Sequence, residues 1–167
     1  MRNLCHLTIK GKEFANRFDT VTNTYEKQAK ISTCTIATKT EAGQHLYLIH
    51  ERLKQPYFGY FGFITGKLRW GETVTQGAIR ELTEETGLVG TMKLKGIEHK
   101  MDFNEKGELL DDKFFYIYKA SSGKNHWLTL NQIKEQKHKF DDMLQLLMII
   151  EGKSFGFIEN MFTVQGF

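Results

Sequence analysis

The stretch GKLRWGETVTQGAIRELTEETGL, residues 66–88, is the most informative part of this 167-residue chain. Its residues follow the spacing G-x5-E-x7-R-E-U-x-E-E-x-G-U, where U is a bulky aliphatic residue. A chance match to all the fixed identities has a probability of about one in 10^8 per starting position. The fixed residues are Gly66, Glu72, Arg80, Glu81, Glu84, Glu85 and Gly87. The match is therefore specific.

The later part of this stretch places three carboxylates on one face of a predicted helix. Glu81, Glu84 and Glu85 are spaced i, i+3 and i+4, so their side chains point the same way. Like charges at this spacing repel, and Arg80 alone is too little to balance them. A hard divalent cation such as Mg²⁺ or Mn²⁺, which prefers oxygen ligands, is the natural partner. The alternative is a solvated helix with surface glutamates, which the flanking glycines disfavour.

The same stretch carries its own helix start and stop signals. Thr73 followed by Gln76 predicts a capping box, and Gly87 predicts a left-handed stop. The face opposite the carboxylates is apolar and suited to packing on a sheet. That face consists of Val74, Ala78, Ile79 and Leu82.

This stretch resembles the Nudix box, and the chain is similar to Nudix hydrolases over roughly residues 30–150. The resemblance implies an α/β (α+β) fold, namely an α/β/α sandwich with a mixed β-sheet. We expect one domain over residues 1–167, with a core at about 30–150 and an extension at each end.

The resemblance also implies roles for residues of the box. The last three glutamates of the box bind metal in Nudix enzymes, a backbone carbonyl before the first glycine often joins them, and the first glutamate lies near or on the metal. Arg80 is expected to orient carboxylates, and Glu85 is our choice of general base. The expected metal ligands are Glu81, Glu84, Glu85, Thr65 and Glu72, and the expected cofactor is Mg²⁺ or Mn²⁺.

Substrate contacts are expected from the segments that enter the box. Lys67 and Arg69 lie in the entering loop, where their cations can face phosphates or remain solvated. Tyr60 and Phe61 belong to an aromatic run that either stacks on a nucleobase or forms core and pocket wall. Extra ligands or a base can come from later acidic residues, which are Glu98, Asp102, Glu108, Asp111 and Asp112.

The resemblance implies hydrolysis of the diphosphate linkage in a nucleoside diphosphate linked to another moiety. ADP-ribose hydrolases carry a proline about where Phe103 stands, and the tyrosine that marks dinucleoside polyphosphate hydrolases is absent. We therefore expect a nucleoside triphosphate, as for MutT-like enzymes. The alternatives are hydrolysis of ADP-ribose, a nucleotide sugar or another dinucleotide, and a non-catalytic nucleotide-sensing domain.

Composition limits the expected partners and location of the protein. The net charge of +3 suits a small nucleotide substrate but lacks the clustered basic face of a nucleic-acid binder, so nucleic acid is not an expected partner. No apolar run is long enough to cross a membrane, and the first ten residues lack the apolar segment of a secretory signal. The cytoplasm is the expected location.

Hydrophobic alternation and turn residues predict the remaining elements. Strands are expected at residues 3–10, 30–39, 45–50, 88–101 and 112–120. Further expectations are a turn at 41–44, a loop at 51–56, a short helix after Trp127 and a closing helix at 141–151. The ends, residues 1–29 and 152–167, carry apolar residues that predict packing, and a homodimer that pairs them is a hypothesis.

Overall fold

The computed structural model describes residues 8–53, 57–121 and 127–163. Its helices are α1 Ile9–Ala15, α2 Val74–Thr86, α3 Leu130–Glu135 and α4 Met143–Glu151. Its strands up to the box are β1 Phe18–Asp19, β2 Thr24–Tyr25, β3 Lys30–Glu41, β4 Gln44–Leu48, β5 His50–Glu51, β6 Phe61–Gly62 and β7 Ile64–Lys67. The later strands are β8 Met92–Phe103, β9 Leu109–Ser121, β10 Trp127–Leu128 and β11 Gly156–Thr163.

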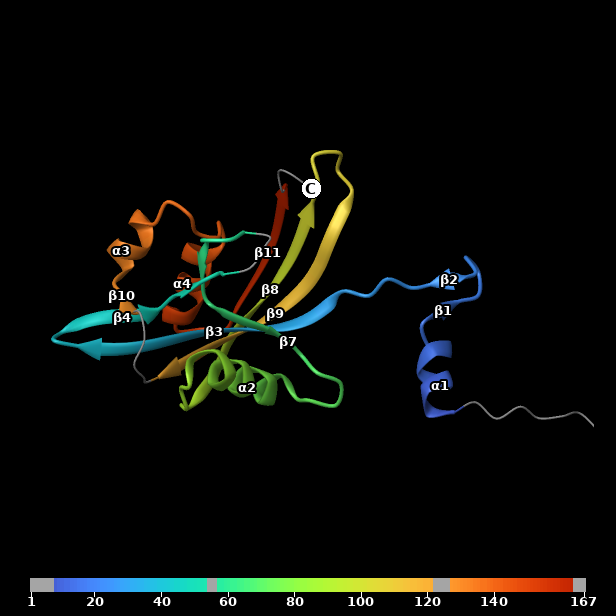
Figure 1. The fold of residues 1–167 in the computed structure, drawn as a ribbon, viewed down its shortest axis with the longest axis horizontal. Helices are drawn as coiled ribbons and strands as arrows, with labels where there is room; N and C mark the ends of the chain where they lie inside the picture. Colours follow the sequence, from blue (N-terminus) through green and yellow to red (C-terminus); the bar gives the residue numbers. More distant parts are fainter. Residues whose placement is uncertain (1–7, 54–56, 122–126, 164–167) are drawn as a thin grey trace, which may run out of the picture.

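A mixed sheet forms the centre of the molecule, with the order β10-β4-β3-β9-β8-β11. The central strand β3 pairs in parallel with β9, and its other edge is shared between β4 and β7, both antiparallel. Helix α2 lies on one face of the sheet, whereas α3 and α4 lie on the other (Figure 1). This arrangement confirms the predicted α/β/α sandwich.

The alternation of side chains along β3 divides the core into two clusters, because successive strand residues face opposite sides of a sheet. Cys34 and Ile36 face the α4 side, where they join Met143 and Leu147. Ala37 faces the α2 side, in the cluster that also contains Leu48, Ile64 and Leu82. The sheet therefore anchors α2 on one face and α4 on the other.

Helix α2 begins and ends where its sequence predicts. The Thr73 side chain accepts from the Gln76 backbone N–H, and the Gln76 side chain accepts from the Thr73 backbone N–H. Gly87 closes the helix in the left-handed region, with φ of 69°. On the predicted apolar face Leu82 is only 2% exposed, but Ile79 is 41% exposed, so the apolar face is narrower than predicted.

Gly96 marks a close approach between β8 and the chain that leads into β11. A Cβ atom there would lie 2.4 Å from the Gly156 carbonyl oxygen and 2.8 Å from Cγ2 of Ile149. We expect Gly96→Ala to lower the free energy of unfolding by about 3 kcal/mol, the upper end for an overpacked site. Urea unfolding measures the effect, and Gly43→Ala is the control: its Cβ would meet nothing within 4 Å, so it should lose only about 1 kcal/mol, from the strain of a φ of 76°. Equal losses in the two variants would contradict this account.

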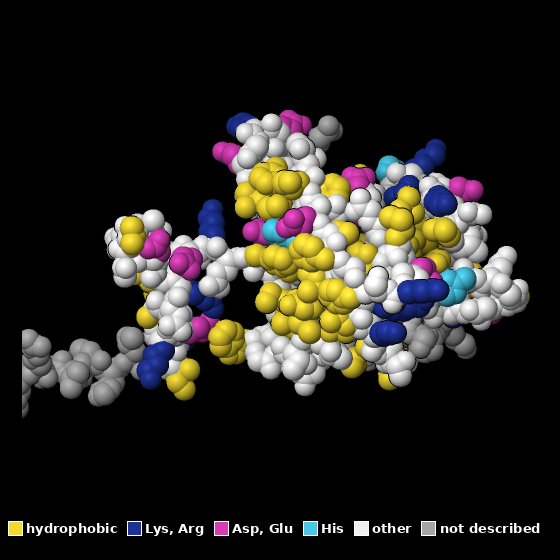
Figure 2. Space-filling model, turned by 180° about the vertical axis from the view of Figure 1, so that it is seen from behind, with side chains coloured by type: hydrophobic (Ala, Val, Ile, Leu, Met, Phe, Trp, Pro, Cys, Tyr) yellow, Lys and Arg dark blue, Asp and Glu magenta, His cyan; other side chains and the backbone are white. Residues whose placement is uncertain are grey.

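The N-terminal segment differs from its prediction. Residues 3–7 lie outside the described part of the chain, but the expected strand is wrong at Ile9, where α1 begins behind the N-cap residue Thr8. A helix forms because the Thr8 hydroxyl accepts from the Gly11 backbone N–H, satisfying one free helix donor. The segment lies beside the main body and carries apolar side chains on its surface (Figures 1 and 2). Phe14 and Val21 are examples, so the predicted packing fails here.

The C-terminal segment, unlike the N-terminal one, packs against the main body. Strand β11 pairs in parallel with β8 along its whole length, and its residues alternate between partly buried and exposed. Ile158 packs against the core, whereas Phe157 and Met161 face outward and are exposed. Packing of this segment was predicted, but its strand was not.

Other boundaries differ as well, and β9 begins at Leu109 and not at residue 112. The segment predicted as a loop from residue 51 begins with β5, which pairs with β6 through Glu51 and Phe61, and residues 54–56 of that loop lie outside the described chain. Strand β8 begins at Met92 and not at residue 88. In the described part of the chain, no helix has the length and apolar character needed to cross a membrane.

Candidate active site

The loop before α2 approaches the helix closely at Gly66. A Cβ atom on this residue would lie 1.9 Å from the Cδ atom of Glu81. Only a residue without a side chain leaves room for the Glu81 carboxylate at this position. Strand β7 holds the loop in place, because Gly66 pairs with Thr33 on β3. The first fixed glycine of the box is therefore explained by a contact with one of its glutamates.

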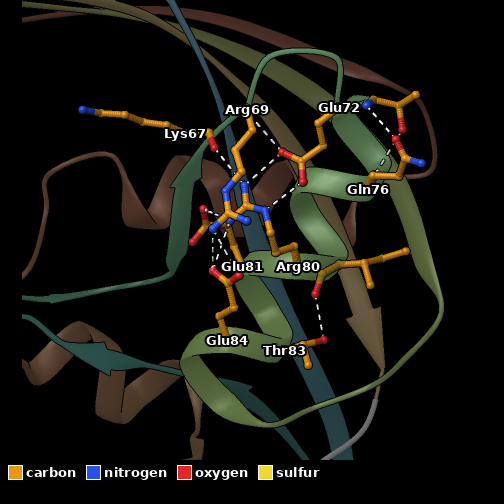
Figure 3. A network of polar contacts seen from close by, with 10 residues as sticks. Lys67, Arg69, Glu72, Gln76, Arg80, Glu81, Thr83 and Glu84 are labelled. Atoms are coloured by element: carbon orange, nitrogen blue, oxygen red, sulfur yellow. Dashed lines mark hydrogen bonds and ion pairs between the residues drawn. The ribbon is translucent and has the colours of Figure 1, made fainter.

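Arg80 is the centre of a polar network that joins this loop to α2 (Figure 3). Its guanidinium binds Glu72 through two nitrogens, at 2.8 Å from Nε to Oε1 and 3.0 Å from Nη2 to Oε2. Nη1 donates to Oε1 of Glu81 at 2.5 Å and to Oε2 of Glu84 at 3.2 Å. Nη2 also donates to the Lys67 carbonyl oxygen at 3.0 Å. One cation thus holds three box carboxylates and the entering loop.

Glu72 is fully engaged by this network. Besides Arg80, the backbone N–H of Arg69 donates to its Oε2 at 3.0 Å. The hydrogen bonds from Arg80, followed by that from Arg69, lower the pKa of Glu72 to about 2. The same contacts with Glu72 raise the pKa of Arg80 further above its ordinary value. These contacts tie Glu72 to Arg80 and to the entering loop, and its role as a metal ligand stays a prediction.

The two cations of the entering loop point in different directions. Nη2 of Arg69 lies 3.2 Å from Oε1 of Glu84 and 3.3 Å from its Oε2. The Lys67 side chain extends away from the carboxylate cluster, while its carbonyl faces Arg80 (Figure 3). Arg69 is thus placed beside a predicted metal ligand, and neither residue lines the cleft described next.

A cleft of about 830 Å³ opens on the α4 side of the sheet. Thr65 and Glu85, two of the predicted metal ligands, line one part of it. Partial burial raises the pKa of Glu85, and the nearby carboxylates of Glu81 and Glu84 add to this effect, while cationic neighbours oppose it. The carboxylate face of α2 therefore borders an enclosed space large enough for a nucleotide.

Aromatic residues form one wall of this cleft. Tyr57, Tyr60, Phe63 and Phe140 line it, and the Phe140 ring centroid lies 5.3 Å from that of Tyr57 and 5.7 Å from that of Tyr60. Phe61 packs against the core instead. The aromatic run thus contributes to both core and pocket wall, as one of the two sequence interpretations expected.

Charged side chains cover the floor of the cleft, where β3, β9 and β8 lie side by side. Lys113 binds Asp102 at 3.0 Å and Asp111 at 2.8 Å, and Lys30 binds Asp111 at 2.6 Å. Of the later acidic residues considered from sequence, Glu98, Asp102 and Asp111 line the cleft. Asp112 lies on the other face of the sheet, because it neighbours Asp111 on the strand, and binds His99 at 2.9 Å.

The box carboxylates suit a hard divalent cation in their chemistry. Glu81, Glu84 and Glu85 supply oxygen donors from one helix face, and Gly66 leaves space where a side chain would intrude. Across residues 8–53, 57–121 and 127–163, however, no three acidic, histidine or cysteine side chains form a ready metal cluster. Arg80 currently holds Glu81 and Glu84, so ion binding requires these side chains to adjust.

Comparison with known families agrees with this geometry. A NUDIX domain model matches residues 30–147, which span α2, α3, the first part of α4 and every strand of the central sheet except β11. The chain belongs to the Nudix family. Nudix hydrolases generally use a divalent metal ion, consistent with the donor chemistry of α2.

One relative by sequence is an ADP-ribose pyrophosphatase from Methanocaldococcus jannaschii. It is 34% identical over 68 residues, which cover 40% of this Nudix chain and 40% of that protein. The alignment thus spans less than half of that relative.

Solved structures share the Nudix fold. The NUDIX domain of Shewanella oneidensis NrtR, solved in complex with ADP-ribose, has a TM-score of 0.65 at 18% identity, covering 87% of this chain and 97% of that one. The MutT protein from Bacillus halodurans has a TM-score of 0.63 at 22% identity, covering 80% and 90%. At these identities the likeness establishes the fold alone.

Sequence reasoning missed several cleft residues. Strand pairing brings together Lys30, Lys100 and Lys113, and an ion pair with Lys100 joins Asp142, the N-cap residue of α4, to them. The alternation along β8 places Glu98, Lys100 and Asp102 on one face and was readable from sequence. Nothing in the sequence indicates which partner strands lie beside them.

Proposed function

We propose that this protein is a divalent-metal-dependent hydrolase that cleaves the diphosphate linkage of a nucleoside diphosphate joined to another moiety. The observation that carries the proposal is the row of box carboxylates on α2, which borders the 830 Å³ cleft through Glu85. In this proposal Glu81, Glu84 and Glu85, with the carbonyl of Thr65, hold the metal. Mg²⁺ or Mn²⁺ bound there would neutralise phosphate oxygens and acidify a bound water.

Residues of the chain itself have the remaining proposed roles, which are to position the ligands, accept a proton and contact the substrate. Arg80 positions Glu81 and Glu84 and ties them to the entering loop through Glu72. Glu85, whose pKa is raised by partial burial, is the proposed acceptor of the proton from the attacking water. Arg69 lies beside the predicted metal ligand Glu84, where its guanidinium can pair with a phosphate oxygen. Lys67, Tyr60 and Phe61 remain predicted substrate contacts.

For the substrate we propose ADP-ribose first. The matched stretch of the Methanocaldococcus jannaschii ADP-ribose pyrophosphatase supports it, as does the ADP-ribose complex of the NrtR NUDIX domain. The floor of the cleft offers both lysines and carboxylates, which suit the hydroxyl groups of a second sugar.

A nucleoside triphosphate is the second candidate. It is the substrate that the sequence predicts, since Phe103 stands where ADP-ribose hydrolases carry proline, and the likeness to MutT is compatible with it. A nucleotide-sensing role is less well supported, because every glutamate of the box is present.

Product analysis tests the proposal directly. We expect ADP-ribose incubated with the protein and Mg²⁺ to yield AMP and ribose 5-phosphate, with turnover abolished by EDTA and restored by Mg²⁺ or Mn²⁺. Nucleoside triphosphates, nucleotide sugars and dinucleoside polyphosphates are assayed in parallel by chromatography. Release of pyrophosphate and a monophosphate from a triphosphate alone would favour the second candidate. Metal-independent cleavage would contradict the proposed metal dependence, and no cleavage of any compound in the panel would contradict a hydrolase.

A further inference from the structure

In the described part of the chain, the carboxyl group of Glu98 on the cleft floor has no ion pair with a cation, unlike its acidic neighbours. Asp102, Asp111 and Asp142 each have a lysine ammonium within 3.0 Å. Glu98 is 1% exposed and lines the same cleft. Among the described residues its hydrogen-bond partner is the amide of Asn160, whose Nδ2 donates to Oε1 of Glu98 at 2.7 Å. A buried carboxyl with one amide partner retains unused hydrogen-bonding capacity that faces the cleft.

The surroundings of Glu98 favour its neutral form. Burial raises the pKa of Glu98 to about 7, and the Asp142 carboxylate adds to the effect, whereas the Asn160 hydrogen bond and Lys100 and Lys113 oppose it. The Cys34 thiol, on β3, is a further titratable neighbour. Near neutral pH a neutral carboxyl therefore offers one O–H donor and one carbonyl acceptor.

The position of Glu98 argues against a role in activating water. Pairing in the sheet leads from Thr65 to Cys34, from Cys34 to Ile117 and from Ile117 to Gly96, two residues before Glu98. Three steps between strands separate β7 from β8 by about 14 Å. A general base must lie within about 3 Å of the proton that it removes. Glu98 therefore lies in a part of the cleft that is remote from the predicted metal ligand Thr65.

The aromatic wall lies above this remote part of the cleft. Lys100 is two residues from Glu98 on the same face of β8, and its Nζ lies 5.6 Å from the Phe140 ring centroid. Phe140 packs against Tyr57 and Tyr60. Tyr57 has a φ of 69°, a backbone conformation that costs energy for a bulky residue and is often found at ligand sites. The aromatic wall and the polar floor therefore border the same cleft, where a flat aromatic ligand group can pack against the rings.

We propose that Glu98, held by Asn160, reads the hydrogen-bonding edge of an adenine base, while Tyr57, Tyr60 and Phe140 pack against the base. This assignment rests on the proposed function, because it treats the cleft as the nucleotide site. Adenine presents a ring-nitrogen acceptor beside an amine donor. The bond from Asn160 fixes Oε1 of Glu98 as the acceptor and leaves Oε2 to carry the proton. In the same pose, hypoxanthine places a carbonyl oxygen against Oε1 and is rejected.

The test compares ADP-ribose with IDP-ribose, which differ in this edge. Binding is measured by calorimetry in a Glu84→Gln background, where turnover does not interfere. We expect at least about tenfold tighter binding of ADP-ribose at pH 6, falling as the pH rises past 7 because Glu98 ionises. Glu98→Gln retains a donor and an acceptor, so it should keep the preference and remove its pH dependence. Glu98→Leu should abolish the preference.

Glu159→Gln is the matched control, because this residue neighbours Asn160 on β11 but faces the other side of the sheet, where it lies 3.3 Å from His99. Equal binding of the two ligands by the protein with intact Glu98, or an unchanged preference in Glu98→Leu, would overturn the proposal. Hydrolysis without a base preference leaves the proposed function standing and removes this inference. If the unmodified protein binds ADP-ribose selectively but does not hydrolyse it, this inference stands and the proposed function is removed.

Discussion

Replacing Glu84 or Glu85 by glutamine should lower turnover by on the order of a thousandfold while the fold is preserved. Each substitution keeps the shape of the side chain and removes the charge that a hard cation requires. Glu84 is half exposed and held by arginine side chains at 3.2 Å or more, so its loss leaves the core intact. Glu85 lines the cleft itself. Steady-state assays at saturating Mg²⁺ measure the effect, and circular dichroism checks the fold.

Glu135→Gln provides the matched control for this pair. Glu135 ends α3, away from the cleft lining and from the box, so the same chemical change should leave turnover unaltered. Near-normal rates in both Glu84→Gln and Glu85→Gln would rule out the assignment of α2 as the metal-binding helix. A comparable fall in Glu135→Gln would show that the loss is not specific to the site.

Gly66→Ala should be almost as damaging, although it adds a single methyl group and removes no functional atom. The new Cβ would lie 1.9 Å from Cδ and 2.0 Å from Cγ of Glu81, so the glutamate must leave its position. We expect turnover to fall by on the order of a hundredfold, because displaced ligands are costly in preorganised sites. Helix α2 should remain folded, since its caps at Thr73 and Gly87 are untouched.

Gly107→Ala separates this effect from a general cost of removing glycine. Gly107 has a φ of 79° in the turn between β8 and β9, with open space around its would-be Cβ. It should lose about 1 kcal/mol of stability from backbone strain while retaining full turnover. If Gly66→Ala retained turnover too, the close packing of Gly66 on Glu81 would have no catalytic importance.

The box helix was the part of the fold most accessible from sequence, because its signals are local. Thr73, Gln76 and Gly87 act within one or two turns of the chain, and the structure confirms all three. The apolar face of α2 was predicted to include Ile79, which is exposed. Hydrophobic periodicity along the helix cannot show how far the sheet extends beneath it.

The cleft was much less accessible, because its members meet only through strand pairing. Lys30 and Lys113 are opposite one another in the β3–β9 register, although far apart in sequence. Glu98 was one of several acidic candidates, and only its burial and its bond to Asn160 distinguish it. Strand β11 was not predicted. Its residues alternate only between partly buried and exposed, so its hydrophobic pattern is weak.

The position of Arg80 has a consequence for how this protein is made and handled. Its guanidinium pairs with Glu72, Glu81 and Glu84, so a cation of the chain itself offsets part of the charge repulsion on the helix. Under the proposed function, we therefore expect protein stripped of divalent ions to be folded but inactive and to gain activity when the ion is added, unlike a zinc finger, where the ion itself drives folding.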